Sequence, residues 1–236
     1  MTLRRLLSLG APLVAAGALA ALARRWGYRV RTVSHDVARR PPPPSVPRGA
    51  PDDQAEDEGA GARFFRRYRV RVADSALSPR ALVEQITRDL DAFVPAELAR
   101  FEKTAGAPNG MAEGDEYLVH ITSPWDGPVR VAEVGPAHFV LTTREGHLEA
   151  GLIRFSADGA AGGELRFQIE SWARSADAVV DLAYDGLGVA RQAQQAMWTF
   201  FCKRVAEACE GRIVGEIEVL TEREVPPDEA DPDHDG

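Results

Sequence analysis

Apolar side chains recur at helical spacing in one long segment near the C-terminus, from Leu187 to Cys209. The segment contains no proline, and its apolar residues return every three or four positions, as they do along one face of an α-helix. These residues are Val189, Ala193, Met197, Phe200 or Phe201, Val205 and Ala208. We therefore predict a long amphipathic helix whose broad apolar face packs on a partner surface.

The preceding part of the chain, residues 63–174, shows mainly the alternation that is typical of strands. Tyr68, Val70 and Val72 alternate with arginines, which predicts a half-buried strand. Ser78 and Pro79 then provide an N-cap and a first-turn proline for a short helix. After a looser segment up to residue 114, strands are predicted over 116–121, 129–134, 138–143, 152–155 and 165–172, and a short extended segment over 213–220.

Short turns rich in Gly, Pro and Asp join these strands, as at Asp126-Gly127. Such links favour antiparallel hairpins. A strand, a helix, a meander of strands and a long helix, in that order, predict an α+β domain with helices on one face of a curved antiparallel sheet. This arrangement is the helix-grip fold, in which the long C-terminal helix closes over the sheet and leaves a cavity between them.

From about Val129 to Gly211 the chain resembles an uncharacterised family of START-like (SRPBCC) proteins, whose superfamily includes lipid-transfer proteins and polyketide cyclases. That family carries a Gly-His-Pro-Glu-x-Gly-Glu motif after a strand, and residues 146–152 read Gly-His-Leu-Glu-Ala-Gly-Leu here. A second family motif, Ala-Phe-Ser-Arg-Pro, corresponds to Ser-Trp-Ala-Arg-Ser at 171–175. The resemblance implies a START-like fold with an apolar cavity, and it supplies no activity.

An uncharged run of 18 residues rich in Ala and Leu, Leu6 to Ala23, lies between two pairs of arginines. The run is long enough for a single membrane-spanning helix, and its Ala-x-Ala ending also fits a cleaved export signal. An amphipathic surface helix ranks last because the run has no polar face. More basic residues follow the run than precede it, which favours an anchor with the domain on the cytoplasmic side. The alternative to this membrane anchor is that the run is a cleaved signal and the domain is exported.

Four regions follow from this pattern: an anchor or signal over residues 1–30, a linker over 31–62, a START-like domain over 63–225 and a tail over 226–236. The linker contains four consecutive prolines, Pro41 to Pro44, and an acidic run from Asp52 to Glu58. Between Ser45 and Ala62 the only apolar side chain larger than Ala or Pro is Val46, so the linker is predicted to be a spacer that holds the domain away from the membrane. The acidic tail is predicted to be disordered.

Charge is distributed unevenly along the 236 residues, whose formal net charge is −8. Residues 1–48 hold nine arginines and one acidic residue, so the remainder is strongly acidic. A basic end beside an apolar run suits anionic lipid, whereas an acidic body without a basic patch argues against nucleic acid. Cys202 and Cys209 lie seven residues apart on the predicted helix, too far for a disulfide between them, and are interpreted as core thiols.

Glu145, His147 and Glu149 form the most site-like group, because in an extended segment their side chains point to one face. Such a group can bind a metal or perform acid–base chemistry, or it can be a polar turn and nothing more. Arg174, at a strand end, can meet a carboxylate ligand or pair with Asp177. We predict neither a metal nor a cofactor, and we assign no catalytic residue.

The sequence therefore predicts a membrane-tethered domain that binds a hydrophobic small molecule or lipid in a cavity under the long helix. The expected ligand-binding residues are His147, Glu149, Arg174, Trp172, Met197, Phe200 and Phe201. Two alternatives stay open. One is a cyclase- or hydrolase-type enzyme that uses the same cavity, and the other is a non-catalytic interaction module whose interior is filled by its own side chains.

Overall fold

The computed structural model describes residues 27–121, 126–176 and 189–230. The predicted membrane segment, the first part of the turn before Gly127 and the end of the acidic tail lie outside the described residues. Within the described ranges, no helix is long and apolar enough to cross a membrane.

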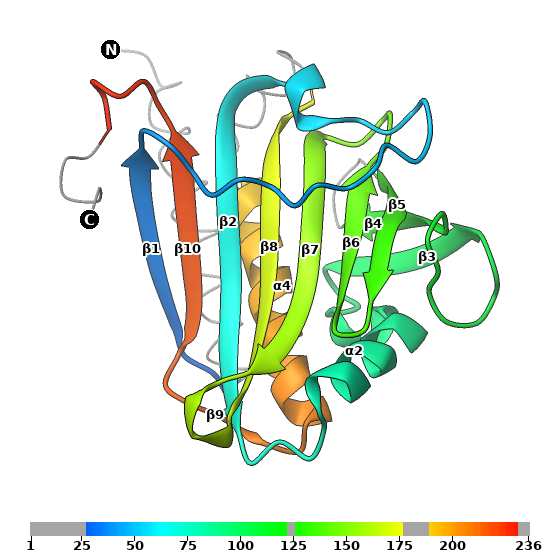
Figure 1. Ribbon diagram of the computed structural model, residues 1–236, viewed down its shortest axis with the longest axis vertical. Helices are drawn as coiled ribbons and strands as arrows, with labels where there is room; N and C mark the ends of the chain where they lie inside the picture. Colours follow the sequence, from blue (N-terminus) through cyan, green and yellow to red (C-terminus); the bar gives the residue numbers. More distant parts are fainter. Residues whose placement is uncertain (1–26, 122–125, 177–188, 231–236) are drawn as a thin grey trace, which may run out of the picture.

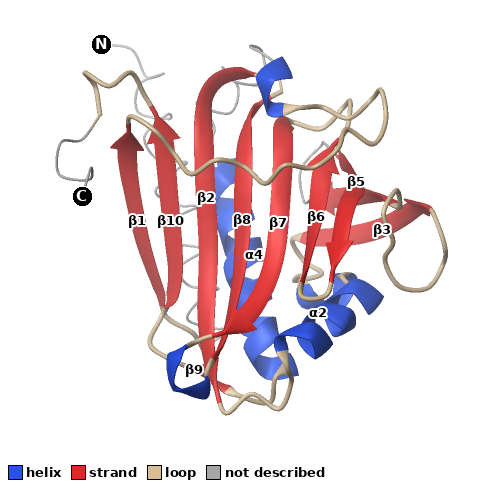
Figure 2. Cartoon of the chain, in the orientation of Figure 1, coloured by secondary structure: helices blue, strands red, loops and turns tan. Residues whose placement is uncertain are grey.

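Ten strands form one sheet in the described part of the chain, and α-helices cover one of its faces (Figures 1 and 2). The strands are β1 (Val30–Val37), β2 (Ala60–Ala73), β3 (Ala99–Ala105), β4 (Glu116–Ile121), β5 (Asp126–Gly135), β6 (His138–Thr143), β7 (Glu149–Gly159), β8 (Leu165–Ser175), β9 (Arg212–Ile213) and β10 (Ile217–Glu224). The helices are α2 (Pro79–Arg88) and α4 (Val189–Ala208), with short turns η1 (Glu56–Glu58), η2 (Asp91–Phe93) and η3 (Ala161–Gly163). The α+β class with a large sheet and a long C-terminal helix is confirmed.

The strand order across the sheet is β1-β10-β2-β8-β7-β6-β5-β4-β3, and β9 pairs with β2. Strands β3 to β8 form the antiparallel meander that their short turns predict. At the other edge, β1 pairs in parallel with β10, with Val30 opposite Ile217. A strand from the C-terminal end of the chain therefore lies between two strands from its N-terminal part.

The face of the sheet that is turned toward α4, here called the inner face, is apolar. Every second residue of a strand points to the same face, and the inner-face residues in the middle of β2 and β8 are 2 % exposed or less. They include Tyr68, Val70 and Val72 of β2 and Phe167 and Ile169 of β8. The half-buried strand predicted from the alternation around Val70 is confirmed.

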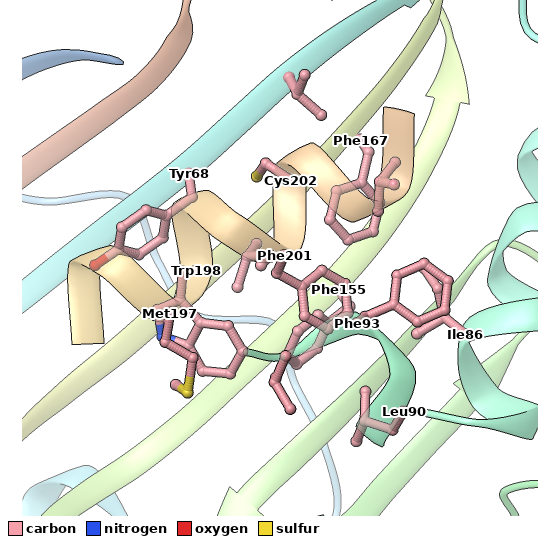
Figure 3. Packing of buried hydrophobic residues seen from close by; sticks show 14 of the residues in the cluster. Tyr68, Ile86, Leu90, Phe93, Phe155, Phe167, Met197, Trp198, Phe201 and Cys202 are labelled. Carbon is pink, nitrogen blue, oxygen red and sulfur yellow. The ribbon is translucent and has the colours of Figure 1, made fainter. Parts of the chain in front are cut away.

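Helix α4 packs on the inner face through residues that the helical pattern marks as apolar. Met197 is 4 % exposed, and Phe201 and Val205 are fully buried. The Phe201 ring lies near the rings of Phe155 (centroids 5.5 Å apart) and Phe167 (5.7 Å), as Figure 3 shows. Aromatic side chains thus fill the space between the sheet and the second half of the helix.

Helix α2 covers the part of the inner face that α4 leaves open. Its N-cap is Ser78, whose side chain accepts a hydrogen bond from the Ala81 N–H at 3.2 Å. Leu82 and Ile86, one turn apart, are fully buried in the same core as Phe155. The short helix predicted from the Ser-Pro pair is confirmed.

Residues 38–58, here called the strap, cross the outer face of the sheet, on the side opposite α4 (Figure 1). The Trp172 indole N–H donates to the Pro41 carbonyl at 2.9 Å, and Arg130 pairs with Asp53, both side chains being 5 % exposed. The prediction of a spacer over residues 31–62 is therefore wrong for these residues, since β1 and the strap belong to the folded body. Ion pairs and hydrogen bonds hold the strap, so it lacks the apolar pattern that marks packed segments.

Two further elements differ from the sequence-based expectation. Strand β3 lies within the segment that was expected to be loose, and it pairs with β4 along its length. Strand β10 extends to Glu224, beyond the short extended segment predicted around residues 213–220. Both are strands at or beside a sheet edge, where side chains are mixed in polarity and the alternation is weak.

Candidate functional site

The loop between β6 and β7 carries the Gly-His motif and is held by hydrogen bonds on two sides. The His147 N–H donates to the Arg144 carbonyl at 3.0 Å, closing a turn in which Gly146 has a φ of +95°. The Glu145 N–H donates to the Asp52 carbonyl of the strap at 2.9 Å. The turn and the strap together fix where the His147 side chain lies.

The His147 ring is enclosed by protein atoms on most sides and is anchored at one nitrogen. Nδ1 lies 2.9 Å from both the backbone nitrogen and the carbonyl oxygen of Glu149. The opposite ring edge lies over Gly127, where a Cβ atom would come within 2.8 Å of Cδ2 and Nε2. Burial lowers the pKa of His147, and the nearby Glu149 carboxylate partly opposes this shift. The imidazole is therefore neutral at pH 7.

Glu149, the first residue of β7, places its carboxylate on the inner face between the sheet and α4. Oε1 accepts a hydrogen bond from Nη1 of Arg66 on β2 at 3.1 Å, and Oε2 accepts one from Nε2 of Gln194 on α4 at 3.1 Å. The Arg66 and Glu149 side chains are 7 % and 12 % exposed. We call Arg66, His147, Glu149 and Gln194 the inner polar cluster.

The inner polar cluster interrupts a face that is otherwise built from apolar side chains. Two residues beyond Arg66 on the same strand, Tyr68 is 2 % exposed and packs in the core. Desolvating a buried ion pair can cost more than its attraction returns, and replacing such a pair by apolar residues is often neutral or stabilising. A buried ion pair at this place is therefore weak evidence for a stabilising role, which makes a functional role worth testing.

A surface cleft of about 540 Å³ opens on the other side of the β6–β7 loop. Residues of the strap and of the loop line it, among them Arg48, Asp52, Gln54, Glu145, His147 and Leu148. His147 thus belongs both to this cleft and, through Glu149, to the inner polar cluster. The volume of the cleft is within the range of small-molecule sites.

The structure divides the predicted ligand-binding residues between two faces of the sheet. His147, Glu149, Met197 and Phe201 lie on the α4 side. Trp172 instead lies on the outer face, where its ring is 5.1 Å from that of Phe65.

Two other predicted residues also point away from the space under α4. Arg174 shares the outer face with Trp172 and donates from Nη2 to the Gly61 carbonyl at 2.6 Å. Phe200 lies at the side of α4, partly exposed, with the Lys203 ammonium 5.7 Å from its ring centroid. Period-two alternation explains the Arg174 placement, because Phe167 and Ile169 face inward and every even-numbered residue of β8 therefore faces outward.

Arg66, and not Arg174, is the arginine that lies on the inner face, where it pairs with Glu149. The sequence alone could have predicted this position, because Arg66 belongs to the same alternating set of residues on β2 as the buried Tyr68, Val70 and Val72. Extending that alternation by one step toward the N-terminus places an arginine on the inner face. Gln194 offers no comparable signal, because polar residues on the flank of an amphipathic helix are ordinary.

Among the residues that the structure describes, no three His, Cys, Asp or Glu side chains lie together in an arrangement that could hold a metal ion. Glu145, which the sequence groups with His147 and Glu149, is exposed.

No curated protein matches the sequence. Among solved structures, the chain is similar to norcoclaurine synthase from Thalictrum flavum in complex with dopamine and hydroxybenzaldehyde, at 13 % identity and a TM-score of 0.45, over 61 % of this chain and 87 % of that one. It is also similar to a conserved protein from Geobacillus kaustophilus (11 % identity, TM-score 0.42, 64 % and 99 % of the two chains). A third similar structure is Ara h 8.0201 (14 % identity, TM-score 0.40, 62 % and 99 %).

A family model described as a domain of unknown function (DUF1990) matches residues 27–204. The match includes β1, the strap, the β6–β7 loop and most of α4. It therefore covers the residues that were expected to form a linker as well as most of the expected domain. Since the match spans well over half of the sequence, this chain belongs to the DUF1990 family.

Proposed function

We propose that the domain binds a small, mainly apolar molecule or lipid between the inner face of the sheet and the first half of α4. The observation that carries the proposal is the inner polar cluster, a buried set of polar groups on an apolar face. A binding site of this kind combines an apolar wall with a few polar groups that orient the ligand. Met197 and Trp198 supply the wall on α4.

The space around Phe201 is filled, so the proposed ligand position lies toward the other end of the helix. Phe93, Phe155 and Phe167 surround Phe201 within 5.7 Å between ring centroids. Gln194, two turns before Phe201 on α4, reaches the Glu149 carboxylate instead of an apolar neighbour. The change from aromatic to polar contacts along α4 supports a binding position near Gln194.

We further propose that the N-terminal run Leu6–Ala23 tethers the domain to a membrane. This part of the proposal rests on the sequence alone, with export as the alternative. Because Tyr28 is already packed, its hydroxyl 3.1 Å from Thr199 Oγ1, only residues 24–27 separate the run from the folded body. Four extended residues reach roughly 14 Å, so a tethered domain would stay close to the lipid surface.

The test uses the full chain in nanodiscs that contain a photoactivatable diazirine analogue of hexadecanol. Irradiation followed by peptide mass spectrometry is expected to label peptides that contain Glu149 or Met197. The double variant Arg66→Leu/Glu149→Leu should fold, because an apolar pair replaces an ion pair, and should lose this labelling. The matched control replaces the outer-face pair Arg166–Asp158, 2.8 Å apart, by leucines and should keep it.

Equal labelling of both double variants would remove the inner polar cluster from ligand recognition. If the wild-type chain shows no labelled interior peptide, the binding proposal itself is wrong. Fractionation of cells that express the full chain tests the tether separately, since a soluble chain shortened at its N-terminus would indicate cleavage and export.

A second candidate function is an enzyme of the cyclase or hydrolase type that uses His147. The supporting observation is that its imidazole is neutral, lines the cleft and is anchored through Nδ1, which suits acid–base chemistry. His147→Ala should then abolish turnover of a candidate substrate while thermal unfolding stays cooperative. Unchanged turnover would exclude this residue from catalysis.

A further inference from the structure

The inner polar cluster is electrically balanced among the residues that the structure describes. The Arg66 guanidinium and the Glu149 carboxylate pair directly, at 3.1 Å between Nη1 and Oε1. His147 adds no charge because burial lowers its pKa. Tyr68, the buried neighbour of Arg66 on β2, also stays neutral, since burial raises the pKa of its hydroxyl well above the ordinary value.

One hydrogen-bond acceptor of the inner polar cluster has no donor among the described residues. A carboxylate oxygen can only accept hydrogen bonds, so the Gln194 amide must turn its NH₂ group toward Glu149. Its carbonyl oxygen Oε1 is then directed elsewhere, and this buried atom has no hydrogen-bond partner among the described residues. Buried acceptors without a partner are rare in native proteins and call for a specific explanation.

We infer that the ligand of this site carries an uncharged group with a hydrogen-bond donor, a hydroxyl in the simplest case, and that this group donates to Gln194. The inference rests on the binding function proposed above and names the chemical class of its ligand. A fatty or terpenoid alcohol, a sterol or a diacylglycerol presents such a group at the end of an apolar body.

Charged ligands fit the cluster poorly. A carboxylate or sulfonate has no donor for Gln194, and its natural partner Arg66 is already neutralised by Glu149. An ammonium group has donors, but its natural partner Glu149 is neutralised in the same way. Either ion would enter as an uncompensated buried charge, which proteins avoid.

The test is competition against the hexadecanol photoprobe on the full chain in nanodiscs. Hexadecanol should compete at a mole fraction at least tenfold lower than hexadecanesulfonate or hexadecylammonium, both of which are ionised at neutral pH. Hexadecyl methyl ether, which keeps the oxygen but lacks the donor, should be weaker than hexadecanol by about the same factor. Equal competition by alcohol and ether would remove the hydrogen bond to Gln194 from the inference.

Charge-changing variants give the decisive comparison. Glu149→Gln leaves the Arg66 charge unbalanced and should shift the ratio of sulfonate to alcohol binding by tenfold or more toward the sulfonate. Arg66→Gln, which leaves Glu149 unbalanced, should shift preference toward the ammonium compound. Glu170→Gln, on the outer face of β8, should leave all ratios unchanged.

The outcomes separate the two proposals. A wild-type chain that prefers the sulfonate or the ammonium compound, or a Glu149→Gln chain with unchanged ratios, overturns the inference while leaving apolar binding intact. A wild-type chain from which no competitor displaces the probe overturns the binding function, and the inference falls with it. Cooperative thermal unfolding of each variant shows that lost binding does not come from lost folding.

Discussion

Phe200 and Phe201 are neighbours on α4 with opposite surroundings, which makes them a matched pair for testing how the helix packs. Phe201 is fully buried and touches Phe93, Phe155 and Phe167, with ring centroids 5.3 to 5.7 Å away. Truncating a buried Phe to Ala removes its transfer free energy and leaves a cavity, at a cost of about 3 to 5 kcal/mol. We therefore expect Phe201→Ala to lower the free energy of unfolding by that amount.

Phe200→Ala should cost much less. Its ring is partly exposed at the side of α4, so truncation loses a partial burial of about 1 to 2 kcal/mol. For a domain of this size each kcal/mol lowers Tm by roughly 2 to 4 °C. Urea titration followed by tryptophan fluorescence measures the difference in unfolding free energy between the two variants. Trp198, beside the Phe201 ring, is a local reporter. Equal losses at the two positions would refute the placement of α4 on the sheet.

Other changes test the strap and the β6–β7 loop. Asp53→Asn leaves the buried Arg130 guanidinium short of a partner and should cost about 3 kcal/mol in urea unfolding, whereas Asp36→Asn, in an exposed ion pair, should leave the midpoint unchanged. Because the pKa of His147 is lowered in the folded protein, the unfolded chain takes up the proton at a higher pH than the folded one, and stability present above pH about 6.5 is lost as the pH falls. His147→Gln should flatten the plot of unfolding free energy against pH in this range. An unaltered plot would assign the pH dependence to other groups. Gly127→Ala places a Cβ within 2.8 Å of the His147 ring and should shift the ring's NMR signals, which a ring lying elsewhere would not show.

Local periodicity was sufficient to predict the elements that bury one regular face. Helix α4 and strands β2 and β4 to β8 repeat their apolar residues at the spacing of their own geometry, and that spacing also places Met197 and Phe201 in the core. The same alternation, extended two residues from Tyr68 toward the N-terminus of β2, predicts the inward position of Arg66. The same alternation therefore predicts both the buried face of β2 and the position of one residue of the candidate site.

Elements that rely on distant partners could not be predicted in this way. Strand β1 has no clean alternation and is stabilised by β10, nearly 190 residues away in the sequence. Trp172 was predicted to be one of the ligand-binding residues of the cavity under the long helix. The strap covers the outer face and buries Trp172 there instead. A sheet covered on both sides makes apolar character a poor guide to which face a residue occupies.

The position of β10 between β1 and β2 has a consequence for folding during synthesis. The ribosome delivers β1 before β10, and its hydrogen-bonding partner is complete only at Glu224, 187 residues after Val37. At about 5 to 20 residues per second, β1 waits roughly 10 to 40 seconds with its edge unpaired. Pairing across such a sequence separation is intrinsically slow. The nascent chain must keep the position between β1 and β2 open until β10 is synthesised, so premature pairing of β1 with another chain is the characteristic misfolding risk of this topology.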